Sequence, residues 1–260
     1  MMSLEYFTLL GAVLSRIETE QMQAIRSAGE LVGDSIAAGG ILHTFGSGHS
    51  HMIAEEAFFR AGGLAPVNAI LDERLVFFNG AAESTHAERE PGYAEVLLKR
   101  EDIRARDAAI IISNSGRNAV PIEVALGMKA RDVKVIAITN LKQSMRSTSR
   151  HSSGKRLFEL ADVVIDNCVH EGDAALEIPG IPYRIGPMST VAGAAIINAV
   201  VIEGVEVLQK RNLPVPVFSS ANIEEASDSA MLSIIAQWRS RVRLFRDHPN
   251  QHTGKTTEFL

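Results

Sequence analysis

Two short loops rich in glycine, serine and asparagine carry the residue types best suited to hold an anion. Each follows an apolar run and leads into a segment with helical spacing. Glycine allows close backbone approach, hydroxyl and amide groups donate hydrogen bonds, and the first N–H groups of a helix attract negative charge. We therefore predict that both loops bind a phosphate group. The loop residues are Gly46, Ser47, Gly48, His49 and Ser50 in the first, and Ser113, Asn114, Ser115, Gly116, Arg117 and Asn118 in the second.

The same loops have an alternative interpretation that needs no ligand. Serine and asparagine also cap helix N-termini, where their side chains accept a bond from a free N–H group for about 1 kcal/mol. A single loop of this kind is explained equally well by a cap. Two such loops favour a binding site, because the carboxyl ends of parallel strands meet at one edge of a sheet.

No other motif gives an equally specific signal. His49 and His51, with Glu55 and Glu56 one turn later, are metal-ligating residue types, but no further ligands follow at a familiar spacing. The glycines of the first loop begin a dinucleotide-binding pattern and lack its third glycine. We therefore predict neither a metal nor a cofactor.

The composition argues against several classes of protein. Of 260 residues 46% are hydrophobic, enough to bury a core without disulfides, and the only cysteine, Cys168, fits a reducing compartment. A formal net charge of −5 argues against a broad nucleic-acid surface. The N-terminal segment has no basic start, and its apolar part is too short to span a membrane. We expect a cytoplasmic protein with neither a nucleic-acid nor a membrane partner.

The elements that must position the two loops alternate along the chain. Short apolar runs separated by helical segments are typical of a parallel sheet covered on both faces. This pattern predicts an α/β fold, a three-layer α/β/α sandwich flanked by long terminal helices. The expected strands are residues 41–45, 65–71, 108–112, 133–139 and 163–166, and the expected helices are residues 4–38 (one helix or two), 50–60, 91–99, 120–130, 188–211 and 224–246.

We expect a single domain over residues 1–260, because the chain shows no repeat, low-complexity segment or linker. Two polar features near the strand ends leave two interpretations each. Residues 83–90 are a loop able to close over a ligand or a solvated charge run, and His151 is an acid–base group or a surface histidine. His43, in a strand, is predicted to be a core histidine. The expected parts are a helical segment at 4–38, a core at about 39–211, a helix at 224–246 and a frayed tail at 247–260.

Residues 4–246 resemble the sugar isomerase (SIS) domain. The stretches GSGHSHMIAEEAFFRAGGLAPVN, IIISNSGRNAVPIE and SSGKRLFELADVVIDN carry the resemblance. SIS domains occur in phosphoheptose isomerase, arabinose-phosphate isomerase, glucosamine-phosphate synthase and N-acetylmuramic acid phosphate etherase. The chain is most similar to bacterial SIS proteins grouped as phosphosugar-binding or phosphoheptose isomerase-like. The resemblance implies a flavodoxin-like sheet of five parallel strands and a phosphorylated sugar as ligand.

The resemblance also implies roles for individual residues. It assigns the phosphate cradle to Ser50, Ser113, Ser115 and Asn118, with N–H groups from Gly116 and Arg117. The family usually has Ser or Thr where Asn118 stands, so an amide replaces a hydroxyl. The start of the last core helix, Ser189 and Thr190, is expected to face the sugar, although a plain N-cap explains both residues equally well. The long terminal helices imply a homodimer or homotetramer.

Acid–base candidates follow from the helix after the first loop. Glu56 and Arg60 stand where phosphoheptose isomerase has a metal-binding histidine and a glutamate, so neither the metal nor an identical mechanism is expected. We favour Glu56 as the base, with Glu55 and His151 as further catalytic candidates. The alternative is that both glutamates face solvent or pair with Arg60.

Three functions of a phosphosugar site remain open at this point. The first is an isomerase that removes a proton beside a carbonyl, acting on an aldose, ketose or amino-sugar phosphate. The second is a non-catalytic sensing module, which is less expected because no DNA-binding domain is attached. The third is a lyase or etherase acting on an amino-sugar phosphate. A nucleotide-dependent oxidoreductase is a distant fourth.

Overall fold

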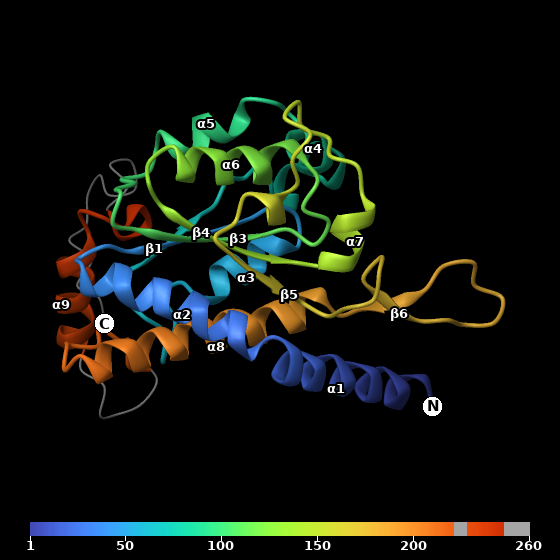
Figure 1. Cartoon of the computed structure of the whole chain (residues 1–260), viewed down its shortest axis with the longest axis horizontal. Helices are drawn as coiled ribbons and strands as arrows, with labels where there is room; N and C mark the ends of the chain where they lie inside the picture. Colours follow the sequence, from blue (N-terminus) through green and yellow to red (C-terminus); the bar gives the residue numbers. More distant parts are fainter. Residues whose placement is uncertain (221–227, 247–260) are drawn as a thin grey trace, which may run out of the picture.

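A five-stranded parallel sheet forms the centre of the computed structural model, which describes residues 1–220 and 228–246. The strand order is β2-β1-β3-β4-β5, as expected for a flavodoxin-like sheet (Figure 1). In this order the connection from β1 runs toward one edge of the sheet and the connection from β3 runs toward the other edge. The change of side leaves a crevice at the carboxyl ends of β1 and β3. The structure confirms the predicted α/β sandwich. The strands are β1 (Leu42–Gly46), β2 (Val67–Ile70), β3 (Ala108–Ile112), β4 (Lys134–Thr139) and β5 (Val163–Asp166).

Helices cover both faces of the sheet because each buried strand alternates between two apolar cores. In β3, Ile110 and Ile112 face one core and Ile111 faces the other. Figure 1 shows α2 and α8 below the sheet and α5 and α6 above it. The covering helices are α2 (Met22–Ala37), α3 (Ser50–Glu56) and α8 (Ser189–Lys210) on one face, and α5 (Tyr93–Leu98) and α6 (Ala119–Lys129) on the other.

Close packing of α2 on α8 depends on two glycines. A Cβ atom at Gly29 would lie 2.3 Å from Glu203 Cβ, and one at Gly33 would lie 2.5 Å from Val207 Cβ. Among the described helices, α8 is the one long and apolar enough to span a membrane. Much of it is nevertheless buried against α2 and α3, as in the core helix of a globular domain.

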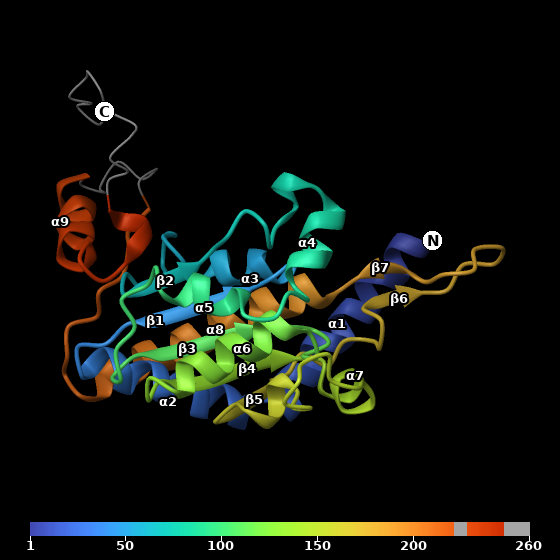
Figure 2. The same ribbon diagram turned by 90° about the horizontal axis from the view of Figure 1, so that it is seen from above.

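The N-terminal helix α1 (Met2–Glu20) and a β-hairpin project together from the body, as both ribbon views show (Figure 2). The hairpin consists of β6 (Ala174–Leu176) and β7 (Ile185–Pro187), and the Tyr6 hydroxyl donates to Pro187 O at 2.9 Å. Hydrophobic side chains remain exposed here. They are Leu4, Phe7, Leu14, Ile181, Tyr183 and Ile185.

A buried charged network ties the C-terminal segment to the amino end of the sheet. Both Asp107 carboxylate oxygens accept from Arg241 Nη2 at 2.8 Å, and His43 Nε2 lies 3.1 Å from Asp107 Oδ2. Burial would raise the pKa of the Asp107 carboxyl, but hydrogen bonds from His43, the Arg104 N–H group and Arg241 outweigh it and hold the pKa below its usual value. His43 is therefore the core histidine that the sequence predicted.

Several boundaries differ from the sequence predictions. Residues 4–38 form two helices, which break at Gln21. Residues 83–90, predicted as a loop, contain most of α4 (Ala81–Ala87), which buries only Ser84 and Ala87 and so shows no helical pattern.

The helix predicted over 224–246 is α9 (Asp228–Trp238), and a 3₁₀ turn at Arg243–Phe245 follows it because the chain turns there into the Arg241 network. Residues 224–227 and 247–260 lie outside the described residues. The helix predicted at 50–60 ends at Glu56, and α7 (Leu141–Arg146) and the hairpin were not predicted.

Candidate anion-binding site

The fold brings the two predicted loops side by side. Gly46 at the end of β1 pairs in register with Ile112 at the end of β3. The loop residues that follow, 47–50 and 113–118, therefore meet at the crevice where the strand order reverses. This is where ligands bind in open parallel sheets.

The first loop turns sharply from β1 into α3. A Cβ atom at Gly46 would lie 2.3 Å from Ser50 O, so only glycine allows this turn. Gly48 has a φ of +53°, and its N–H donates to Leu75 O at 2.8 Å. The Ser47 hydroxyl donates to Glu88 Oε1 at 2.8 Å, whereas the Ser50 hydroxyl makes no hydrogen bond within the described chain. Ser50 therefore keeps a donor available for a ligand.

Two residues of the second loop are committed to holding its shape. The Asn114 carbonyl accepts from Asn140 N at 3.0 Å, and its side-chain oxygen accepts from Asn167 Nδ2 at 2.8 Å. The Ser113 hydroxyl accepts from Gly116 N at 3.2 Å. Both residues thus shape the loop, and the Ser113 hydroxyl, which only accepts in this bond, keeps its own O–H donor.

Unsatisfied donors collect at the start of α6. The N–H groups of Ser115, Arg117 and Asn118, together with the Ser115 hydroxyl, make no hydrogen bond to any described residue. Val120 N donates to Glu88 O at 3.1 Å, which joins α4 to this helix start. Free N–H groups at a helix N-terminus are the donors that an anion satisfies.

The cap interpretation does not describe these helices. His49 and Asn118 occupy the N-cap positions of α3 and α6, and neither side chain makes a capping hydrogen bond. Asn118 Oδ1 instead accepts from Arg150 Nη1 at 2.9 Å. The start of α6 is therefore open, whereas the first N–H groups of α3, those of Ser50, His51 and Met52, donate to carbonyl groups of the first loop.

Three arginines gather around this open helix start without a salt bridge to any described carboxylate: Arg89, Arg117 and Arg150. Partial desolvation lowers the pKa of the otherwise exposed Arg150 guanidinium, and the charges of Arg117 and Arg89 lower it further. Arg117 Nη2 donates to Thr148 Oγ1 at 3.0 Å, but its Nε is buried without a partner among the described residues. With Glu88 as the opposing acid, the side-chain charge at the start of α6 is positive on balance, which attracts an anion.

The two candidate bases lie on different sides of α3. Glu56 stands at the far end of the helix from Ser50, where its Oε1 accepts from Asn198 Nδ2 at 2.8 Å and pairs with Arg60. Glu55 Oε2 lies 3.8 Å from His51 Nε2, and the Glu55 side chain lines a separate cavity. Neither carboxylate contacts the second loop.

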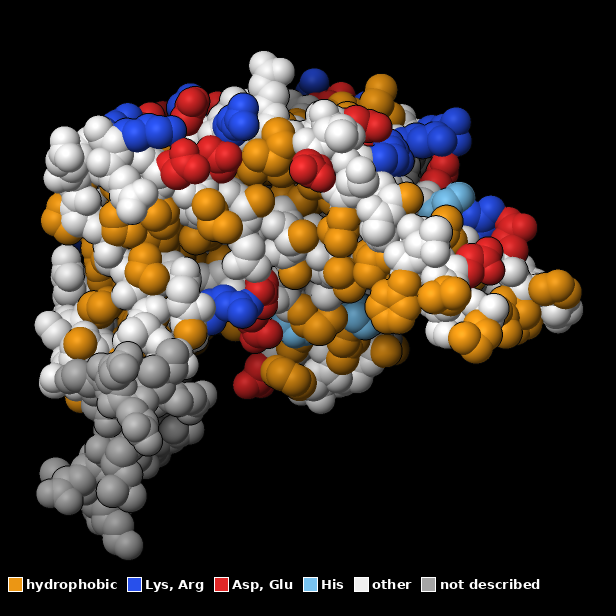
Figure 3. Space-filling view, turned by 90° about the horizontal axis from the view of Figure 1, so that it is seen from below, with side chains coloured by type: hydrophobic (Ala, Val, Ile, Leu, Met, Phe, Trp, Pro, Cys, Tyr) orange, Lys and Arg blue, Asp and Glu red, His pale blue; other side chains and the backbone are white. Residues whose placement is uncertain are grey.

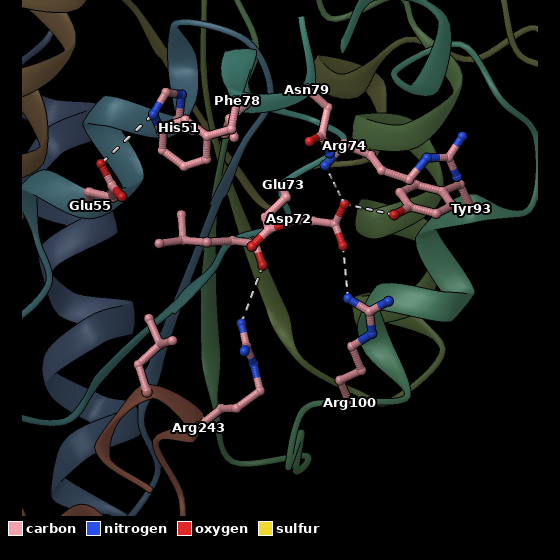
Figure 4. Close-up of a pocket in the computed structure, with 13 residues that line it drawn as sticks. His51, Glu55, Asp72, Glu73, Arg74, Phe78, Asn79, Tyr93, Arg100 and Arg243 are labelled. Atoms are coloured by element: carbon pink, nitrogen blue, oxygen red, sulfur yellow. Dashed lines mark hydrogen bonds and ion pairs between the residues drawn. The ribbon is translucent and has the colours of Figure 1, made fainter. Parts of the chain in front are cut away.

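That cavity, of about 500 Å³, lies at the end of β2, and His51 and Glu55 of α3 form one of its walls (Figure 4). Its arginines are paired. Asp72 accepts from Tyr93 Oη at 2.7 Å and from Arg100 Nη1 at 2.8 Å, and Arg74 pairs with carboxylates outside the cavity. It is therefore a different environment from the open helix start.

The remaining candidates lie at the margin of the site. His151 Nε2 is 3.5 Å from Glu123 Oε1. The Ser189 hydroxyl donates to Asp173 Oδ2 at 2.8 Å, so the N-terminus of α8 already has a carboxylate cap. Thr190 has no side-chain partner among the described residues. Because α3 and α8 run in the same direction, Thr190 lies at the same end of the sheet as Ser50.

Glu88, Arg89 and Arg150 lie near these loops, but the sequence singled out none of them individually, and Glu88 and Arg89 entered only as part of a segment able to close over a ligand. The first two lie in the polar segment 83–90, and Arg150 precedes His151. Their proximity to the loops depends on tertiary hydrogen bonds such as Arg150 N to Arg117 O at 2.8 Å. The spacing of residues along the sequence cannot predict such a contact, because its two residues are distant in the chain. Within the described ranges, no three His, Cys, Asp or Glu side chains cluster as metal ligands.

Comparison with known proteins gives consistent matches. Residues 5–140 match the family model described as SIS domain. The UPF0309 protein of Thermoanaerobacter pseudethanolicus is 42% identical over 246 residues, which cover 93% of this chain and 99% of that protein. The UPF0309 protein of Geobacillus thermodenitrificans is 42% identical over 224 residues, which cover 86% and 90%. The structure of phosphoheptose isomerase from Neisseria gonorrhoeae has the same fold, with a TM-score of 0.50, 19% identity, and coverage of 77% of this chain and 95% of that one.

Proposed function

Because the chain belongs to the SIS domain family, as the sequence resemblance predicted, we propose that it binds a phosphorylated sugar at the crevice between β1 and β3. The observation that carries this proposal is the set of unsatisfied donors at the start of α6. In the proposed complex the phosphate accepts from the Ser50 and Ser115 hydroxyls and from the free N–H groups of residues 115, 117 and 118. A phosphate carries enough acceptor oxygens to use several of these donors at once.

We propose that the bound sugar phosphate is isomerised by proton abstraction beside its carbonyl group, with Glu56 as the base. Glu56 lies about 9 Å along α3 from Ser50, a distance that the carbon chain of a sugar phosphate can bridge. The hydrogen bond from Asn198 holds its carboxylate on the α8 side of the helix. The solved structure named phosphoheptose isomerase has the same fold, which is consistent with this reaction class.

A second candidate function is binding without turnover. Arg60 and Asn198 both contact Glu56 Oε1. An oxygen that already accepts from an amide and pairs with a guanidinium is not available to take a proton from a ligand. This pairing favours a sensing module unless substrate displaces Arg60.

We propose that the chain forms a homodimer or homotetramer. Apolar side chains remain exposed on α1, on the hairpin and on α8. On the face of the molecule drawn in Figure 3, hydrophobic side chains lie along the middle and on the projecting end. An exposed apolar surface of this kind is typical of a protein–protein contact. Light scattering of the purified chain tests this, and a monomer at micromolar and higher concentrations would contradict it.

Proton NMR in D₂O tests the reaction. The purified protein is mixed with hexose, heptose, pentose and amino-sugar phosphates, and the signal beside the carbonyl carbon is followed. We expect the proton beside the carbonyl to exchange with solvent deuterium in one class of substrate. The rate of this exchange should fall by about 10²-fold or more in Glu56→Gln. Glu95→Gln, which removes an exposed carboxylate on α5, is the matched control and should exchange normally. Line broadening without exchange across the panel would identify a binder and remove the base assignment, and no interaction at all would overturn phosphosugar binding.

A further inference from the structure

Asn118 is oriented by its neighbour Arg150. It is buried at the N-cap of α6, and its side-chain oxygen lies 2.9 Å from Arg150 Nη1. A guanidinium has donors only, so the amide atom that faces it must be the oxygen. The Nδ2 group therefore points away from Arg150, and it has no partner among the described residues.

The segment that carries Arg150 is fixed to the second loop at two points. Arg150 N donates to Arg117 O at 2.8 Å, and Leu157 N donates to Gly116 O at 2.8 Å. These bonds hold residues 150–157 across the loop. The position of the Arg150 guanidinium is therefore set by the same backbone that forms the anion site.

Arg150 also contributes charge that the described chain does not neutralise. Together with Arg117 and Arg89 it forms a cluster without a salt bridge to a described carboxylate, and Glu88 is the acid whose field opposes it. Clustered arginines without such partners suit an anion, because each guanidinium is always charged and presents its donors in a planar fork. Elsewhere in the described chain Arg241 and Arg243, for example, both have such partners.

We propose that Arg150 is a positioning residue of the phosphate site, which holds Asn118 so that its Nδ2 donates to the phosphate and which favours a doubly charged ligand over a singly charged one. This inference rests on the proposed function, because it assumes that a phosphate occupies the start of α6.

A double-mutant cycle with methyl phosphate as the probe tests the pair. Dissociation constants are measured by NMR titration at pH 8 for the wild type, Arg150→Gln, Asn118→Ser and the double variant. Because hydrogen bonds to charged groups are stronger than those between neutral groups, we expect Arg150→Gln to weaken binding about tenfold or more in the wild-type background. The loss should be clearly smaller in the Asn118→Ser background, since a hydroxyl needs no orienting partner. Equal losses in both backgrounds would overturn the positioning role.

Methyl sulfate, which has a similar shape and one charge fewer, tests the charge preference. The wild type should bind methyl phosphate more tightly than methyl sulfate, and Arg150→Gln should reduce that ratio. An unchanged ratio would overturn this part of the proposal. Arg106→Gln is the matched control, because Arg106 also has no described carboxylate partner but lies at the opposite end of the sheet. Wild-type protein that binds neither probe would overturn the proposed function itself, whereas binding with additive losses would overturn only the Arg150 inference.

Discussion

Two groups of charged residues lie at opposite ends of the sheet and use the same residue types differently. At the amino end, Arg241 and His43 both contact Asp107, and the network is buried. At the carboxyl end, Arg117 and Arg150 have no described carboxylate partner and lie beside free N–H groups. The difference separates a structural network, whose charges are paired within the chain, from a site whose donors await a ligand.

The energetic reason for the difference is burial. A charge that is removed from water needs a partner, so residues that cross the interior must be paired. Donors at the mouth of a crevice are satisfied by water until an anion replaces it. Removal of a partner should therefore reduce stability at the amino end and ligand affinity at the carboxyl end.

The largest expected effect is on stability, from Arg241→Met. This substitution leaves the Asp107 carboxylate buried with a much weaker set of partners, and breaking a buried ion pair costs about 3–5 kcal/mol of unfolding free energy. Urea denaturation measures it. Arg150→Gln provides the contrast, because Arg150 is exposed and its loss should change the unfolding free energy by less than about 0.5 kcal/mol. Equal effects of the two substitutions would remove the distinction between the two ends.

A smaller effect on stability, joined to a loss of binding, is expected from Gly116→Ala. Gly116 has a φ of +58°, and a Cβ atom there would lie 2.8 Å from Ser144 Oγ. We expect a loss of about 1–3 kcal/mol in unfolding free energy together with weaker phosphate binding, since the loop must shift. Gly62→Ala is the matched control, with a φ of +78° and no atom within 4 Å of the added carbon. It should keep its phosphate affinity, and similar binding by both variants would place the anion elsewhere.

The fold was predictable where a strand is buried on both faces. The apolar run of β3 has the predicted boundaries, because all five of its residues are apolar and buried. The helix α4 was not predictable, since two buried residues give no periodic pattern. The break at Gln21 was also left open, because helical spacing continues through it.

The candidate site was predictable only in its backbone. Glycine and serine after two buried strands identified both loops, but the state of each donor depends on residues distant in sequence. Ser189 shows this, because its hydroxyl is taken by Asp173 across a hairpin. Ser113 and Ser115 belong to one motif, yet the first bonds within the loop and the second stays free. Their roles become distinct only when the loop is folded.

Calorimetric titration of the double variant Ser115→Ala/Asn118→Ala tests whether a phosphate group binds at the start of α6. Sugar phosphates and the same sugars without phosphate are titrated into the wild type and into this double variant. We expect the wild type to bind only phosphorylated sugars. The double variant should keep its fold but bind them at least about tenfold more weakly, the loss expected for one or two hydrogen bonds to a charged group. Unchanged affinity in the double variant would contradict the placement of the phosphate at the start of α6.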